Sequence, residues 1–174
     1  MQRPRGPIAA ILLLALVLAA AASAAAETTS QPLFRIERSK NANIVQYDAR
    51  VRGDGSLDRK EPVDAYWLRL ASTGERKELK WLARRAAYGF DVDWQKNGSL
   101  ELDMVAPIGR RVRVVKTPDG WEARTRIDGR ESRIERIYVK SRERSFRLPK
   151  VEFIDFAGTD VESGEQRSER YVPD

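Results

Sequence analysis

The densest cluster of polar side chains next to apolar segments is Ser39-Lys40-Asn41-Ala42-Asn43, which Arg38 precedes. It offers an ammonium group, two amides and a hydroxyl, which are donors for a carboxylate, a phosphate or sugar hydroxyls. The same residues also suit a turn between two strands, because Asn tolerates left-handed backbone and bonds its own main chain. As a site, the cluster predicts a solvent-accessible pocket for an anion at one end of the fold. The expected ligand-binding residues are Arg38, Lys40, Asn41, Asn43, Tyr47 and Tyr66.

Carboxylates are the remaining candidates for acid-base chemistry. They occur in pairs that share a strand face, Asp91 with Asp93 and Glu101 with Asp103. Two carboxyl groups about 5 to 10 Å apart can hydrolyse a glycosidic bond, so the alternative function is a carboxylate-dependent hydrolase acting on envelope polysaccharide. That function requires acids to converge in a cleft lined by Trp67 or Trp94, with one raised pKa. Alternating apolar residues beside both pairs instead indicate an exposed face.

The chain contains no His and no Cys. A Ser-His-Asp triad, a cysteine nucleophile, a disulfide and the usual zinc sites are therefore excluded. The acids between Asp155 and Glu165 do not follow the spacing of an EF-hand loop. We accordingly expect no catalytic residues, no metal and no cofactor.

Residues 1–26 have the pattern of a secretory signal peptide. Arg3 and Arg5 precede an uncharged run, and A-x-A sites at residues 22–24 and 24–26 suit signal peptidase. Retention as a membrane anchor is the alternative, but Ala makes up much of the run and is only weakly apolar. The expected mature chain is a single β-rich domain, residues 27–174, that is periplasmic or secreted. No membrane span remains after cleavage, and export argues against nucleic acid as a partner.

Basic residues are concentrated in residues 124–150, which contain ten basic and four acidic residues. Because bases and acids interleave at spacings of two, this stretch is typical of a solvated outer face. It could also attract an anionic envelope ligand such as a lipid headgroup or an acidic glycan.

Most of the mature chain shows the period of two that predicts half-buried strands. Tight turns are expected at Asn97-Gly98, Asp119-Gly120 and Asp128-Gly129. The pattern predicts a mostly β fold, an antiparallel meander of about ten strands that closes into a barrel or sandwich. One helix is expected at about residues 75–87, packed on the sheet, with a capping box at Ser72 and Glu75 and Gly89 as a left-handed terminator.

Three segments resemble a bacterial family known only as domain of unknown function number 4833. They are the ERSKNANIVQYD block at residues 37–48, the PVDAYWLRL strand at residues 62–70, and AYGF at residues 87–90. The resemblance covers nearly all of the mature chain and implies an exported, uncharacterised, mostly β domain with no established activity. Together with the exclusions above, it leads us to expect a non-enzymatic binding or structural module for a small or anionic envelope ligand.

Overall fold

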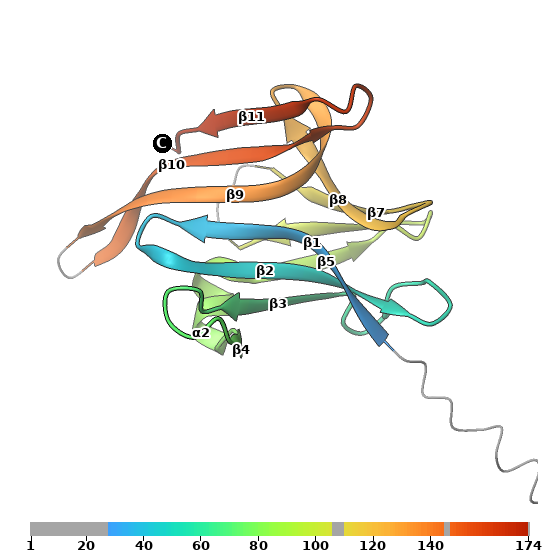
Figure 1. Ribbon diagram of the computed structural model, residues 1–174, viewed down its shortest axis with the longest axis horizontal. Coiled ribbons are helices and arrows are strands. Elements are labelled where there is room, and N and C mark those ends of the chain that lie inside the picture. Colours follow the sequence, from blue (N-terminus) through green and yellow to red (C-terminus); the bar gives the residue numbers. More distant parts are fainter. Residues whose placement is uncertain (1–27, 106–109, 145–146, 174) are drawn as a thin grey trace, which may run out of the picture.

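A computed structural model describes residues 28–105, 110–144 and 147–173 of the chain. The expected signal peptide, residues 1–26, lies outside the described residues. Within the described part the protein is mostly β, and its strands form one curled sheet, a half-barrel (Figure 1). The strands are β1 (Thr28–Arg38), β2 (Asn41–Arg52), β3 (Val63–Leu68), β4 (Arg76–Glu78), β5 (Phe90–Trp94), β6 (Leu100–Met104), β7 (Val112–Thr117), β8 (Gly120–Ile127), β9 (Arg130–Arg144), β10 (Arg147–Asp160) and β11 (Gln166–Tyr171).

The strand order is β4-β3-β2-β1-β9-β8-β7-β6-β5, with β10 and β11 continuing from the other edge of β9. Strands that follow one another in the sequence pair antiparallel, except β4 and β5, which do not pair, so most of the expected meander is confirmed. In addition, β1 pairs parallel with β9 through residues 35–38 and 136–139. This pairing arises because β9 has 15 residues and β8 has 8, so β9 extends beyond β8 and leaves a free edge for β1.

The expected tight turns are confirmed. Asn97-Gly98 lies between β5 and β6, and Gly120 begins β8 directly after the β7 turn. Asp128 and Gly129 connect β8 to β9 as a two-residue loop with φ of 51° and 73°. Two positive φ values are what a hairpin turn matched to strand twist requires.

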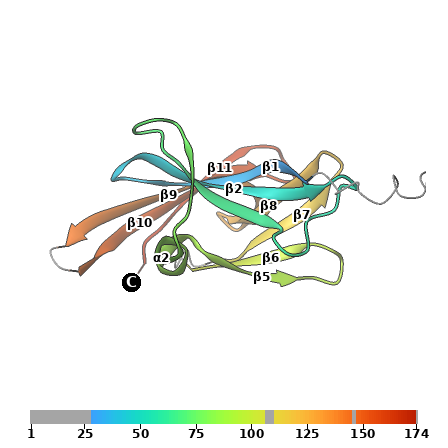
Figure 2. The same cartoon turned by 90° about the horizontal axis from the view of Figure 1, so that it is seen from below.

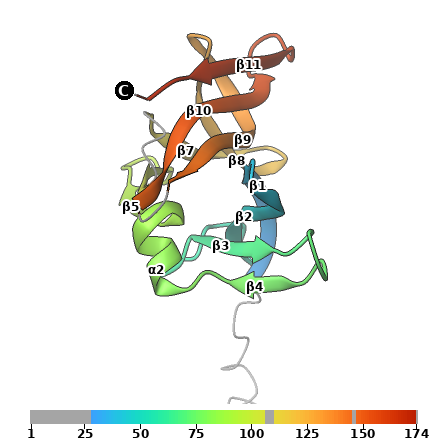
Figure 3. The same ribbon diagram turned by 90° about the vertical axis from the view of Figure 1, so that its left-hand side faces the viewer.

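The helix predicted at about residues 75–87 is wrong in its first part. Residues 76–78 form β4, which pairs with β3, and the Arg69 N–H donates to the Glu75 carbonyl at 3.0 Å to close a hairpin. The helical segment consists of the α-helical turn α2 (Trp81–Ala83) and the π-helical turn η1 (Arg84–Tyr88). The pairing with β3 supplies backbone hydrogen bonds that a local capping box cannot match. The helical segment leads from β4 to β5, the two ends of the strand order (Figure 3).

Gly89 is not a left-handed terminator, because its backbone is extended with φ of −75°. Glycine is required there for a different reason. A Cβ atom at Gly89 would lie 2.4 Å from the Arg84 carbonyl oxygen, to which the Gly89 N–H donates at 2.7 Å.

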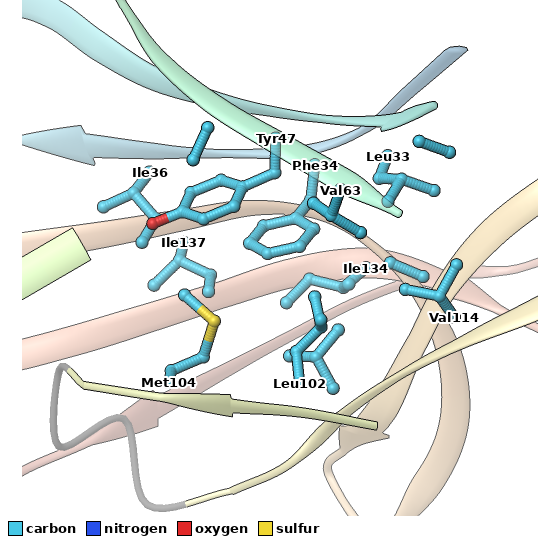
Figure 4. Packing of buried hydrophobic residues seen from close by; sticks show 14 of the residues in the cluster. Leu33, Phe34, Ile36, Tyr47, Val63, Leu102, Met104, Val114, Ile134 and Ile137 are labelled. Carbon is cyan, nitrogen blue, oxygen red and sulfur yellow. The ribbon is translucent and has the colours of Figure 1, made fainter. Parts of the chain in front are cut away.

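The core fills the interior of the half-barrel. Figure 4 shows side chains of β1 to β3, such as Phe34 and Tyr47, meeting Leu102 and Met104 of β6 and Ile137 of β9. The rings of Phe34 and Tyr47 stack with centroids 4.5 Å apart. These side chains occupy the space that an enclosed apolar ligand would need.

None of the helices among the described residues is long and apolar enough to cross a membrane.

Candidate functional site

Figure 2 shows the end of the half-barrel that carries the β1–β2 and β3–β4 turns. A groove of about 310 Å³ lies at this end. We refer to it as the cationic groove. Its lining residues come from β1, β2, the β3–β4 hairpin and the helix: Arg38, Asn43, Trp67, Arg69, Lys77, Glu78, Lys80 and Ala83.

Strand register places four of these side chains, Asn43, Trp67, Arg69 and Lys77, on one side of the sheet. Val45 of β2 is opposite Trp67 of β3, and Trp67 is opposite Lys77 of β4. Because alternate residues of a strand share a face, Asn43 and Arg69 lie on the same side as Val45 and Trp67. The groove is therefore the open end of the face that forms the core.

Arg38, the last residue of β1, is held by two aromatic rings. Its guanidinium carbon is 4.6 Å from the ring centroid of Trp67 and 5.8 Å from that of Tyr88. The two rings contact each other edge to face, with centroids 5.1 Å apart. The Nε atom of Arg38 is buried and has no hydrogen-bond partner among the described residues. Cation–π contacts thus fix the guanidinium in place before any ligand arrives.

Tyr88 does not neutralise the arginine. Burial raises the pKa of the Tyr88 hydroxyl, and the positive charge of Arg38 and a hydrogen bond with its side chain only partly oppose that rise. The phenol therefore stays protonated at neutral pH and places no negative charge beside the guanidinium.

The cationic groove contains four cations and one carboxylate, Glu78. In the described part of the chain, none of the four forms an ion pair. A second groove, on the outer face of β7 to β9, is also rich in arginine but differs in this respect. Its ion pairs are Arg111–Glu101, Arg113–Glu131, Arg124–Glu122 and Arg130–Glu162. Paired arginines have little charge left for a ligand, so the outer groove fits the solvated face expected for residues 124–150.

The structure divides the polar cluster at residues 39–43. Asn43 lines the cationic groove, and its Oδ1 accepts the Ala71 N–H at 3.0 Å, which anchors the β3–β4 turn to β2. Asn41 accepts the Asn43 N–H at 3.1 Å and so acts as a turn residue. Lys40 is exposed in the turn and is not among the groove residues. Of the expected site, Arg38 and Asn43 come together.

Tyr47 and Tyr66 lie outside the groove. Tyr47 is fully buried in the core and donates from its hydroxyl to the Tyr88 carbonyl at 2.9 Å; burial raises its pKa. Tyr66 lies on the opposite face of the sheet and donates to Asp48 Oδ2 at 2.7 Å. Burial and then the Asp48 carboxylate raise the pKa of Tyr66 to about 12. Both tyrosines have structural hydrogen bonds rather than access to a ligand.

The carboxylates of β5 and β6 do not meet a tryptophan. Asp91 is opposite Asp103 and Asp93 is opposite Glu101, on a face that alternates with Val92 and Trp94. The pocket beside Trp94 includes no carboxylate, and the groove beside Trp67 has one. The carboxyl groups with a clear pKa shift all shift downward: Asp54, Asp58, Asp155, Asp160 and Glu169. Among the described residues no group of three or more acids is placed to hold a metal ion.

Sequence reasoning named Trp67 only as a residue that could line a hydrolase cleft, and it missed the other groove residues, Arg69, Lys77, Glu78, Lys80 and Ala83. Alternation from Trp67 to Arg69 followed by the turn residues Ser72 to Gly74 was a hairpin signal. The helical spacing further along the chain obscured it.

A model of the family described as Domain of unknown function (DUF4833) matches residues 34–170. That segment includes every residue of the cationic groove. Comparisons with curated proteins and with solved structures give no match.

Proposed function

Because the chain belongs to the DUF4833 family, whose description names no activity, we propose its function from the geometry: it binds an anionic ligand of the cell envelope in the cationic groove, without catalysis. The observation that carries this proposal is the state of Arg38. Its guanidinium is fixed between Trp67 and Tyr88 and has no carboxylate partner among the described residues.

A fixed guanidinium suits phosphate or carboxylate. Its planar donors match the oxygens of both groups, and little side-chain freedom remains to be lost on binding. Since Nε is buried, the terminal nitrogens are the donors available to a ligand. Lys77, Lys80 and Arg69 add positive charge around the same groove.

The size of the groove limits the ligand. Ligand pockets occupy about 300 to 1,000 Å³, and the cationic groove, at about 310 Å³, is at the small end. It suits one charged group rather than a polymer segment. Hydrogen bonds to charged groups contribute about 1.5 to 3 kcal/mol each. Two of them, about 3 to 6 kcal/mol together, correspond to a Kd of roughly 0.04 to 6 mM.

The envelope location in this proposal rests on residues 1–26, whose sequence has the pattern of a secretory signal peptide. The intact mass of the protein isolated from cells tests it directly. A mature N-terminus at Ala25 or Glu27 supports export, whereas a protein that keeps Met1 and fractionates with the cytoplasm contradicts it.

Isothermal titration calorimetry at low ionic strength tests the groove itself. The probes are glycerol 3-phosphate, for a lipid headgroup, and galacturonate, for an acidic glycan. Arg59 supplies a matched control, because its guanidinium lies 4.3 Å from the Trp94 ring centroid in a different pocket. Arg38→Gln should weaken binding of the preferred probe at least tenfold, while Arg59→Gln should change it less than twofold. Equal losses in both variants, or none in either, would contradict the proposal.

A further inference from the structure

The helical segment beside the groove exposes two large apolar side chains. Trp81 is 70% exposed and Leu82 is 60% exposed. Their neighbours along the chain, Lys80 and Ala83, line the cationic groove. The spacing of Leu79, Leu82, Ala83 and Ala86 predicts that Leu82 faces the sheet, but only Leu79 of the two leucines is buried. The segment therefore turns its bulkiest apolar residues outward, next to the groove.

A third exposed apolar residue lies on the other side of the groove. Leu70 is 54% exposed and follows Arg69, a groove residue. Figure 3 shows the helix and the β3–β4 turn at either end of β4. Apolar side chains thus flank the cationic groove on both sides.

The helical segment itself carries charge of one sign, and Glu78, just before it, is the one carboxylate that lines the groove. Residues 79–90 contain Lys80, Arg84 and Arg85 and no carboxylate. Exposed Trp and Leu beside basic residues are typical of segments that lie in the interface of a membrane, where the indole sits at headgroup depth and the cations meet anionic lipids.

We infer that Trp81 and Leu82 insert into the interface of an anionic lipid bilayer, and that the cationic groove receives the phosphate of a lipid headgroup. This inference rests on the proposed anion-binding function and specifies the ligand. Leu70 forms the contact on the far side of the groove.

A protein partner fits the surface less well. A stable protein interface buries roughly 800 Å² on each side. Three side chains that are already partly buried offer on the order of a few hundred Å². A bilayer needs no matching partner surface, since it accepts single apolar side chains and responds to local positive charge.

Vesicle co-sedimentation tests the inference. The vesicles are phosphatidylcholine alone and phosphatidylcholine with about 30 mol% phosphatidylglycerol, which supplies an anionic surface. The protein is used as isolated from cells, so all variants share the same N-terminus. Wild type should bind the anionic vesicles and not the neutral ones, and added salt should weaken binding. Trp81→Ser with Leu82→Ser should reduce binding at least tenfold. Val172→Ser, which alters a side chain 62% exposed at the end of β11, should leave it unchanged.

The outcomes separate this inference from the proposed function. If the double variant no longer binds anionic vesicles but still binds glycerol 3-phosphate, the inference is supported. The membrane inference fails if the wild type binds glycerol 3-phosphate but no vesicles, or if the double variant binds vesicles as well as the wild type does. In either case the proposed anion binding in the groove still stands. If the double variant instead abolishes self-association seen by native mass spectrometry, the surface is an interface between copies and the inference fails.

Discussion

Replacing Glu169 should destabilise the protein at neutral pH and have no effect in strong acid. Glu169 of β11 accepts two hydrogen bonds from Arg110, at 2.7 and 2.9 Å, and a third from the Asp128 N–H at 2.6 Å. The Arg110 bonds, with help from the Asp128 N–H, lower the pKa of Glu169 from 4.5 to about 2. Its carboxylate is therefore favoured in the folded state.

The size of the effect follows from linkage. Lowering the pKa of Glu169 from 4.5 to about 2 corresponds to ~3 kcal/mol. The side chains of Arg110 and Glu169 are 18% and 29% exposed, so solvent screens part of this and we expect about 1 to 2 kcal/mol. Because the folded pKa lies below the unfolded one, the stabilisation is present above pH 4.5 and is lost as the pH falls toward 2.

Urea unfolding of wild type and Glu169→Gln measures this difference at several pH values. The variant should be less stable by about 1 to 2 kcal/mol at pH 7, and the two curves should converge near pH 2. Glu165→Gln is the matched control, since Glu165 is 71% exposed and contacts Arg167 at 3.5 Å; it should change stability by less than about 0.5 kcal/mol. A difference that persists unchanged in acid would refute the reasoning.

Two further predictions concern the scaffold. Tyr66→Phe removes the hydroxyl that donates to Asp48, so it should cost about 1 to 3 kcal/mol in urea unfolding. The pKa of Tyr66 is raised to about 12, so the folded state favours its neutral phenol and loses that preference as the pH rises through about 12. The variant should therefore lack the step in tyrosinate ultraviolet absorbance near pH 12 that the wild type shows. A step that remains would contradict the assignment. Gly89→Ala places a Cβ against the Arg84 carbonyl and should cost at least about 2 kcal/mol by the same assay. A loss below about 0.5 kcal/mol would show that the contact is easily relieved.

Local signals in the sequence account for much of the fold. The hairpin at Asp128-Gly129 was predictable because both residues suit positive φ, and buried residues alternate along the whole of β8 before it. The parallel pairing of β1 with β9 was not predictable, because it joins residues about a hundred positions apart. It uses a strand edge that is free only because β9 extends beyond the end of β8.

The same division applies to the groove. Arg38 and Asn43 belong to one polar cluster, and the sequence shows them together. Strand register places Trp67 and Lys77 beside them in the groove. This register requires residues 76–78 to pair with β3 as β4 and not to form a helix. The spacing of apolar residues at 75–87 is compatible with a helix. Residues 76–78 form a strand instead because they make backbone hydrogen bonds with β3. The ring contacts that fix Arg38 likewise have no local signal.

Solution NMR tests the central claim most directly. Glycerol 3-phosphate is titrated into protein labelled with ¹⁵N, and the four tryptophan indole signals report on four places in the molecule. Anion binding in the cationic groove predicts a saturable shift of the Trp67 indole and the Arg38 Nε–H, with little change at Trp94 and Trp121. Shifts centred on Trp94, or no saturable shift at Trp67, would contradict it.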